Sequence, residues 1–152
     1  MKLMDILEVD CVVVPLESED KQSAIFALAD RLIEKTDIEE GEALKEAIWQ
    51  RETTRTTGIG GGVAVPHGKT AGVPSLHMAI GRTDRPLDFG SIDSQPVELI
   101  ILLASPLDQT GPHIEALSRI SRMLIDPDVR DRLKALPTAQ AVYDLIVELD
   151  GD

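Results

Sequence analysis

The sequence contains almost no cysteine and no long apolar run. Its single cysteine, Cys11, stands in an apolar segment, so disulfide bonds within the chain and zinc sites built from cysteine pairs are excluded, and we expect a buried Cys11. No stretch is long and apolar enough to span a bilayer, and acidic residues interrupt the N-terminal segment where a secretory signal would be continuously apolar. We therefore expect a cytoplasmic protein without membrane insertion.

Basic residues are also scarce. The chain carries 15 Lys and Arg against 27 Asp and Glu, which gives a formal net charge of -12. A surface with this excess of negative charge repels the phosphate backbone of nucleic acids and the anionic surface of membranes. Neither is expected as a partner.

Glycine is concentrated in one place. Four glycines precede a short apolar run: Gly58, Gly60, Gly61 and Gly62. The β-branched run Val63–Val65 predicts a short buried strand, and Pro66 is expected to end it. His67 is then expected on a loop just past the strand end, fixed in direction by Pro66 and left accessible by Gly68. Glycine clusters are typical of places where the backbone approaches a ligand or another chain.

Two nucleotide-binding patterns fail at this stretch. Gly68-Lys69-Thr70 resembles the end of a phosphate-binding P-loop, but Val63 occupies the place of that motif's first glycine. Val63 also stands where a dinucleotide-binding pattern beginning at Gly58 needs glycine or alanine. A nucleotide-binding domain is therefore not expected.

The rest of the chain alternates between the periods of strands and helices. Strands are predicted at residues 11–16, 63–65, 75–82 and 98–104. Helices are predicted at residues 25–33, 112–124, 128–136 and 138–150, the last capped by Thr138, together with a second helix that Asp37 and Glu40 cap and that ends near Arg51. This alternation predicts an α/β fold in a single domain, residues 1–152, with helices on both faces of the sheet.

Three segments carry more specific expectations. The run from Glu98 to Ala104 is continuously apolar after its first residue, which predicts a central strand covered on both faces. His77 alternates with apolar neighbours and is expected on a strand surface, without a chemical role. Arg51 and Glu52 fit either an exposed ion pair or a part of the site, and the residues alone leave this open.

The chemistry best suited to His67 is phosphoryl transfer. Through one ring nitrogen, a neutral imidazole attacks phosphorus well near pH 7. The N–H of the other ring nitrogen donates a hydrogen bond to a backbone carbonyl, which fixes the tautomer. Backbone N–H groups, a hydroxyl of Thr56 or Thr57 and a second imidazole would stabilise the transferred charge. His113, in the first turn of a predicted helix, is the natural second imidazole, although a helix-start histidine facing solvent fits the pattern as well.

A longer pattern surrounds these residues. Arg51-Glu52 and the segment Thr56–Gly68 together resemble the phosphorylation-site signature of the fructose/mannitol-type enzyme IIA domains of the bacterial phosphoenolpyruvate-dependent phosphotransferase system (PTS). The similarity continues through Phe89, residues 92–97 and 108–110, and residues 113–118, over the length of one whole domain. Within this family the chain is most similar to the stand-alone nitrogen-regulatory form.

The resemblance implies a fold and a set of site residues. The family fold is a mixed β-sheet flanked by helices. His67 would be phosphorylated at Nε2, His113 would help to hold the phosphoryl group, and Arg51 matches the family's site arginine. Thr57 and Gly68 would bind the phosphate. No cofactor and no metal is implied, and the three histidines, far apart in sequence, lack the spacing of metal ligands.

The resemblance also implies partners. A small histidine phosphocarrier protein (HPr or its nitrogen paralogue) would be the phosphoryl donor, and a IIB domain, a regulated transporter or a sensor kinase would lie downstream. Gly61 departs from the polar residue more frequent in the family, which bears on partner choice. Two roles stay open: a phosphoryl carrier serving a sugar permease, and a regulatory switch. An alternative is a non-catalytic regulatory module whose partner affinity does not need phosphorylation.

Overall fold

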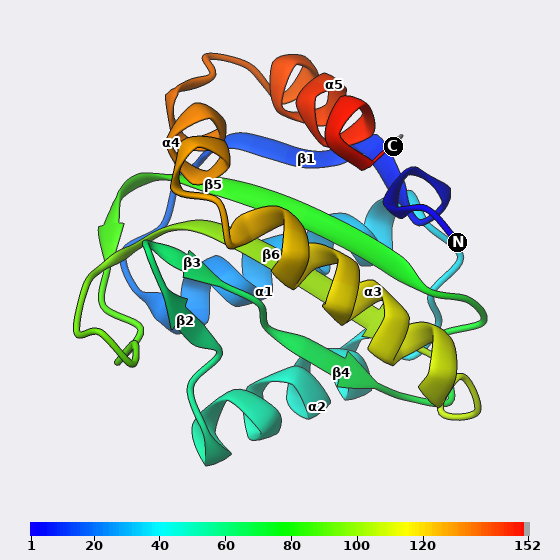
Figure 1. Ribbon diagram of the computed structural model, residues 1–152. Coiled ribbons are helices and arrows are strands. Elements are labelled where there is room, and N and C mark those ends of the chain that lie inside the picture. Colours follow the sequence, from blue (N-terminus) through cyan, green and yellow to red (C-terminus); the bar gives the residue numbers. More distant parts are fainter. Residues whose placement is uncertain (151–152) are drawn as a thin grey trace.

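The computed structural model describes residues 1–150, and within them the chain forms one six-stranded sheet with helices on both faces (Figure 1). The strands are β1 (Leu7–Leu16), β2 (Gly58–Gly60), β3 (Val63–Ala64), β4 (His67–Lys69), β5 (His77–Leu87) and β6 (Val97–Ser105). The α-helices are α1 (Lys21–Lys35), α2 (Gly41–Thr54), α3 (Thr110–Leu124), α4 (Pro127–Ala135) and α5 (Ala139–Asp150), and a 3-10 turn, η1 (Leu3–Asp5), precedes β1. No helix of this described part is long and apolar enough to cross a membrane.

Strand β6 lies at the centre of the sheet. On one side it pairs with antiparallel β5, which in turn pairs with parallel β1 at the sheet edge. On the other side two short strands share β6, because β3 pairs with its first half and β4 with its second half, both in parallel. β2 adds an antiparallel edge beside β3. The sheet is therefore mixed, as expected.

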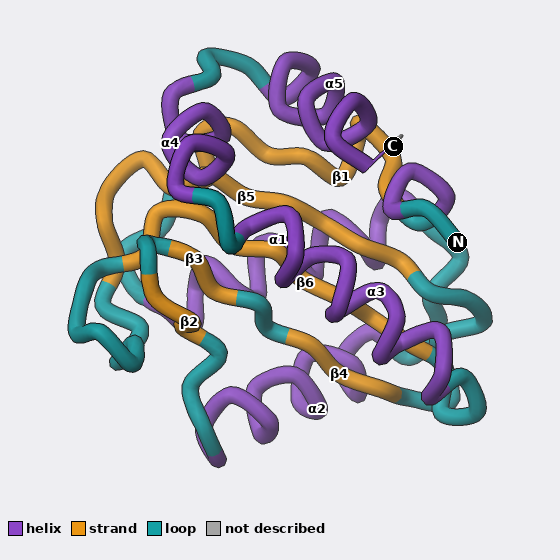
Figure 2. The backbone as a smooth tube through the Cα atoms, viewed as in Figure 1, coloured by secondary structure: helices purple, strands orange, loops and turns teal. Residues whose placement is uncertain are grey.

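The apolar side chains of β6 divide between two cores. Leu99, Ile101 and Leu103 join a cluster with α3, α4 and α5, whereas Ile100 and Leu102 face the cluster of α1 and α2. All five are at most 2% exposed. Figure 2 shows the strands in orange between these two helical layers. The prediction of a central strand covered on both faces is therefore confirmed. Burying a side chain of this size stabilises the fold by roughly 2 kcal/mol.

Cys11 is a buried apolar residue, as predicted. It is 1% exposed and packs in the cluster of α1 and α2. Burial raises the pKa of its thiol to about 11, with the carboxylate of Glu8 acting in the same direction. The thiolate that cysteine chemistry requires is therefore disfavoured at neutral pH.

The predicted start of the second helix is wrong. Glu40 precedes α2 in a left-handed conformation, with φ 54°, and its side chain caps nothing. Asp37 instead places a carboxylate oxygen 2.8 Å from Nε2 of His77, at the start of β5. The buried residues of α2 are Leu44, Ile48 and Glu52, whereas Ala43 is exposed.

Other element boundaries moved by a few residues. β1 begins at Leu7 and runs through Pro15, which is tolerated because β1 is an edge strand. β5 extends to Leu87, and α3 begins at Thr110. Thr138 accepts a hydrogen bond from the N–H of Ala141 at 3.1 Å, which confirms it as the cap of α5.

Candidate active site

His67 opens a short strand, so the prediction that it lies on a loop is wrong. Pro66 interrupts the pairing after β3, yet its carbonyl accepts a hydrogen bond from the N–H of Leu103 at 3.0 Å, which keeps the chain alongside β6. Pairing then resumes with His67 opposite Leu103. The imidazole is thus held by the sheet while its side chain is only half-buried.

The ring of His67 has a defined tautomer. Its Nδ1 lies 2.9 Å from the carbonyl oxygen of Val65. A carbonyl oxygen only accepts hydrogen bonds, so Nδ1 carries the proton and Nε2 keeps its lone pair. This arrangement is the one predicted for a nucleophilic histidine whose attacking atom is Nε2.

His113 meets His67 across the end of β6. The ring centroids lie 5.4 Å apart with an interplanar angle of 61°, an edge-to-face arrangement. His113 is only 4% exposed, and its Nδ1 forms a short hydrogen bond with the hydroxyl of Ser105, the last residue of β6. The solvent-facing alternative for His113 is therefore wrong.

Both imidazoles are tuned toward the neutral form. Burial lowers the pKa of His67, the hydrogen bond from Nδ1 to Val65 opposes this, and the positive charge of Arg51 adds to the lowering. Burial also lowers the pKa of His113 to about 4, with the charges of His67 and Lys69 acting in the same direction. A neutral imidazole is the nucleophilic form, so the site is prepared for attack at neutral pH.

The two rings line a cavity of about 480 Å³ between α2, β4 and the start of α3. Two cations stand at its wall. Arg51, near the end of α2, donates to the carbonyl of Arg55 at 3.0 Å, and the ammonium of Lys69 lies 3.5 Å from the hydroxyl of Thr110. In a chain with a net charge of -12, this local positive charge favours an anionic group beside His67. The full lining is Ala47, Gln50, Arg51, Thr54, His67, Gly68, Lys69 and His113.

Gly68 lines the cavity beside the half-buried His67 but is itself buried. A Cβ at this position would lie 2.8 Å from Cγ1 of Ile48 and 3.1 Å from the Ile48 backbone nitrogen. The glycine therefore allows α2 to pack directly against β4. This close packing brings Arg51 to the cavity that holds His67.

Thr57 does not line the cavity of His67, so the structure does not support the predicted contact of its hydroxyl with phosphate. The residue is 6% exposed, and its N–H donates to the carboxylate of Glu52 at 2.8 Å. Its hydroxyl donates to the second oxygen of the same carboxylate. Thr57 is therefore a structural anchor behind the site.

Glu52 is not part of an exposed pair with Arg51. It is 2% exposed, and its ion-pair partner is the ammonium of Lys21, at 2.9 Å. Lys21 also donates to the carbonyl of Phe89 at 3.0 Å, and the hydroxyl of Thr56 donates to that carbonyl at 2.7 Å. Sequence reasoning missed the role of Lys21 because nothing in its local pattern marks it.

Ser105 was missed as well. It is fully buried at the end of an otherwise apolar strand, where an unpaired hydroxyl would be costly. Its position between the apolar run and Pro106 was the available signal. The structure uses it to orient the ring of His113.

His77 lies apart from the other two histidines. His77 pairs with Asp37, while His67 and His113 share the cavity. Within residues 1–150 there is no group of three or more His, Cys, Asp or Glu side chains placed to hold a metal ion.

The glycine turn between β2 and β3 is tied down by side chains. Gly60, Gly61 and Gly62 all have positive φ, at 99°, 66° and 81°. The N–H of Gly61 donates to Asp93 at 3.0 Å, and its carbonyl accepts from Lys134 at 2.6 Å. The turn thus needs residues that tolerate left-handed backbone, which explains the glycines without a ligand.

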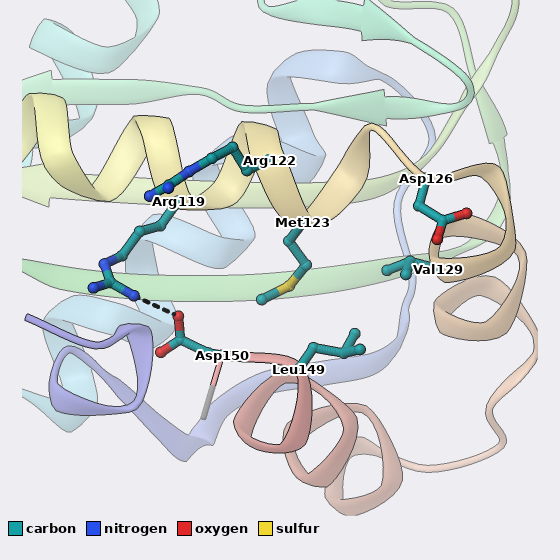
Figure 3. A pocket seen from close by; sticks show the side chains of 7 residues that line it. All are labelled: Arg119, Arg122, Met123, Asp126, Val129, Leu149 and Asp150. Carbon is teal, nitrogen blue, oxygen red and sulfur yellow. Dashed lines mark hydrogen bonds and ion pairs between the residues drawn. The ribbon is translucent and has the colours of Figure 1, made fainter. Parts of the chain in front are cut away.

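A second cavity, of about 410 Å³, lies between α3, α4 and α5 (Figure 3). Arg119 there donates to Asp150 at 3.2 Å, and apolar side chains such as Met123 and Leu149 line the middle. Neither His67 nor His113 lines it. The two histidines, together with Arg51 and Lys69, line the first cavity, at the end of β6.

Comparison with known proteins places this geometry in context. The family described as phosphoenolpyruvate-dependent sugar phosphotransferase system, EIIA 2, matches residues 5–149. The chain is 38% identical over 146 residues to a nitrogen regulatory protein of Bradyrhizobium diazoefficiens, covering 96% of this chain and 95% of that protein.

Solved structures share the fold. The crystal structure of nitrogen regulatory protein IIA-Ntr from Neisseria meningitidis is 31% identical, with a TM-score of 0.86 over 93% of this chain and 97% of that one. The mannitol enzyme IIA of Escherichia coli, in its complex with phosphorylated enzyme IIB, is 21% identical, with a TM-score of 0.79 over 94% of this chain and 99% of that one.

Proposed function

Because the chain belongs to the EIIA 2 family of the phosphoenolpyruvate-dependent sugar phosphotransferase system, we propose that His67 is the residue that accepts and carries the phosphoryl group. As a family member the chain is a phosphotransferase component. One observation carries the assignment to His67: its Nδ1 is held by the Val65 carbonyl, which leaves Nε2 free in a cavity that also contains His113.

The transfer step follows from this tautomer. The lone pair of His67 Nε2 attacks the phosphorus of a phosphohistidine on the donor, a small histidine phosphocarrier protein. The new Nε2–P bond forms as the donor's N–P bond breaks, and the donor imidazole leaves with the electron pair. The Nδ1 proton stays on the ring, where the Val65 carbonyl stabilises the positive charge that develops.

His113 is the group that steadies the transferred phosphoryl oxygens. When the hydroxyl of Ser105 donates to Nδ1 of His113, the ring proton resides on Nε2 and is available to a phosphoryl oxygen. The ring stays neutral because burial lowers its pKa to about 4, so it acts as a fixed hydrogen-bond donor.

Arg51 and Lys69 supply the positive charge. Both line the cavity of His67, and a phosphoryl group brings close to two negative charges. Arg51 is exposed, so water screens its attraction and it contributes less than a buried arginine would. The backbone of Gly68 completes the wall on the side of β4.

The regulatory role is favoured over sugar transport. The nitrogen regulatory protein of Bradyrhizobium diazoefficiens is 38% identical to this chain, whereas a fructose-specific EIIA component of Haloferax volcanii is 30% identical. Phosphorylation of His67 would bring close to two negative charges beside Arg51 and Lys69 and so change the cavity wall from positive to about neutral, which gives a partner two distinct surfaces to bind. The mannitol enzyme IIA forms a complex with its phosphorylated IIB partner, and here a IIB domain, a transporter or a sensor kinase would occupy the corresponding face.

The test is reconstituted phosphorylation. The protein is incubated with phosphoenolpyruvate, enzyme I and the phosphocarrier, and label that is labile to acid and stable to alkali is measured. We expect His67→Ala to abolish the label and His77→Ala, a histidine outside the cavity, to retain it. Label that persists without His67 would overturn the assignment, and no label on the wild-type protein would favour the non-catalytic regulatory module.

A second variant tests His113. Removing one stabilising donor costs about 100-fold in rate. His113→Ala is therefore expected to slow labelling by about that factor without abolishing it. An unchanged rate would exclude His113 from the site.

A further inference from the structure

A continuous series of contacts connects a buried carboxylate to the reactive ring. The N–H of Thr57 donates to Glu52 at 2.8 Å, and the carbonyl of Thr57 accepts from the N–H of Val65 at 3.1 Å. The carbonyl of Val65 in turn accepts from Nδ1 of His67 at 2.9 Å. Three hydrogen bonds thus join the last turns of α2 to the imidazole.

The far end of this series is held firmly. Glu52 is 2% exposed, and three donors converge on its carboxylate: the N–H and hydroxyl of Thr57, and the ammonium of Lys21 at 2.9 Å. Lys21 begins α1 and also donates to the carbonyl of Phe89, so the carboxylate is held by donors from two separate segments of the chain. A buried charge satisfied in this way resists displacement, because each donor would lose its acceptor.

The end of this series at His67 determines which ring nitrogen carries the proton. The Val65 carbonyl is the group that assigns the proton of His67 to Nδ1. If that carbonyl tilts away, the tautomer with the proton on Nε2 becomes accessible, and this form cannot attack phosphorus through Nε2. Val65 precedes Pro66 and lies between two short strands, so the sheet alone fixes it weakly, and the hydrogen bond to Thr57 supplies the second constraint.

We propose that Lys21, Glu52 and Thr57 are positioning residues for phosphoryl transfer, which hold the Val65 carbonyl in place and thereby keep Nε2 of His67 unprotonated. None of the three lines the cavity, so they act only through Val65 and His67. This inference rests on the proposed role of His67 and adds the device that selects its tautomer.

The negative charge of Glu52 makes a second contribution. It raises the pKa of His67, opposing the burial that lowers it. Positive charge develops on the ring as the Nε2–P bond forms, and a fixed carboxylate behind the ring favours that charge. The carboxylate is neutralised only in part, because its partner Lys21 lies at the boundary with solvent.

The experiment measures the tautomer directly. Nitrogen-15 NMR of the imidazole separates the two ring nitrogens of neutral His67 in the unphosphorylated protein, and no donor protein is needed. Thr57→Val removes the hydroxyl and retains the backbone N–H, whereas Glu52→Gln retains the shape and removes the charge. We expect both variants to increase the population with the proton on Nε2 and to slow labelling by about tenfold, and Thr57→Ser to restore the wild-type behaviour.

The matched control is Glu46→Gln, the same substitution at an exposed position of α2. It should change neither the tautomer nor the rate. A purely structural role of Glu52 would lower the unfolding temperature and leave the tautomer population of the folded protein as in the wild type, and that result would overturn the inference. Failure of the wild-type protein to label at His67 would instead overturn the proposed function, since the NMR measurement stands without it.

Discussion

The packing of α2 on β4 leads to a quantitative prediction at Gly68. The added methyl of Gly68→Ala would lie 2.8 Å from Cγ1 of Ile48, 3.1 Å from its backbone nitrogen and 3.3 Å from its Cα. The side chain of Ile48 can rotate, but its backbone cannot. Helix α2 must therefore move by a few tenths of an ångström, carrying Arg51 with it.

The free-energy cost follows from two opposing effects. Overpacking a close-packed core costs about 1–3 kcal/mol. Replacing glycine by alanine also restricts the unfolded chain and returns about 0.4–1 kcal/mol. With both effects at the middle of their ranges, the net loss expected for Gly68→Ala is about 1.3 kcal/mol. For a chain of this length that corresponds to a fall in Tm of about 3–5 °C.

Thermal and urea unfolding measure this loss, with Gly111→Ala as the control. A Cβ at Gly111 meets nothing within 4 Å, so this variant should be as stable as the wild type or slightly more stable. Gly68→Ala should also cost less when Ile48 is already alanine, because the closest contact is then gone. Equal Tm values for Gly68→Ala and Gly111→Ala would refute the argument that glycine is required for close packing.

Three further predictions concern Glu52, His113 and Ser105. Glu52→Ala leaves the buried N–H and hydroxyl of Thr57 without an acceptor and should cost about 3 kcal/mol in urea unfolding, while Glu46→Ala at the exposed surface should stay within about 0.5 kcal/mol of wild type. His113 has a pKa of about 4 when folded, below the ordinary 6.5, so below pH 6.5 the unfolded chain binds the additional proton. Stability should be full above pH 6.5 and fall by about 3 kcal/mol as the pH drops toward 4, and His113→Gln should lack this part of the pH dependence. Ser105→Ala removes the partner of the His113 ring and should slow phosphoryl transfer by about tenfold in the labelling assay, a rate equal to wild type being the contrary result.

The part of the sheet that could be predicted from the sequence is the strand with the clearest hydrophobic pattern. The run that forms β6 is apolar at nearly every position, and no competing pattern fits it, so both its place and its burial were predictable. His67 was selected as the candidate site residue for a different reason, since the glycines, Pro66 and Gly68 around it form a long and specific signature.

The unsupported predictions concern side chains whose hydrogen-bond partners could not be identified from the local sequence pattern. Asp37 has the sequence context of a helix cap, but its carboxylate is taken by His77, which follows 40 residues later in the chain. The hydroxyl of Thr57 has the right chemistry for phosphate, but the buried Glu52 takes it. Both cases depend on tertiary contacts that local propensity does not contain.

The meeting of the two histidines could not be derived from spacing. It requires that β4 pair with the second half of β6 and that α3 turn back immediately after that strand. A shift of this register by one residue would direct His67 to the opposite face of the sheet. Sequence similarity to the family supplied this pairing, and the backbone geometry explains it.

Both histidines of the candidate site are therefore held in place by β6. His67 is hydrogen-bonded along the second half of β6, and His113 hangs from its end through Ser105. Fraying of η1 and α5 at the chain ends would leave the two rings in mutual contact, because the pairing of β4 and the hydrogen bond to Ser105 tie both rings to β6, the innermost strand. Amide exchange at Leu103 and Ala104 should accordingly be as slow as global unfolding, and catalytic competence should persist up to the melting transition itself.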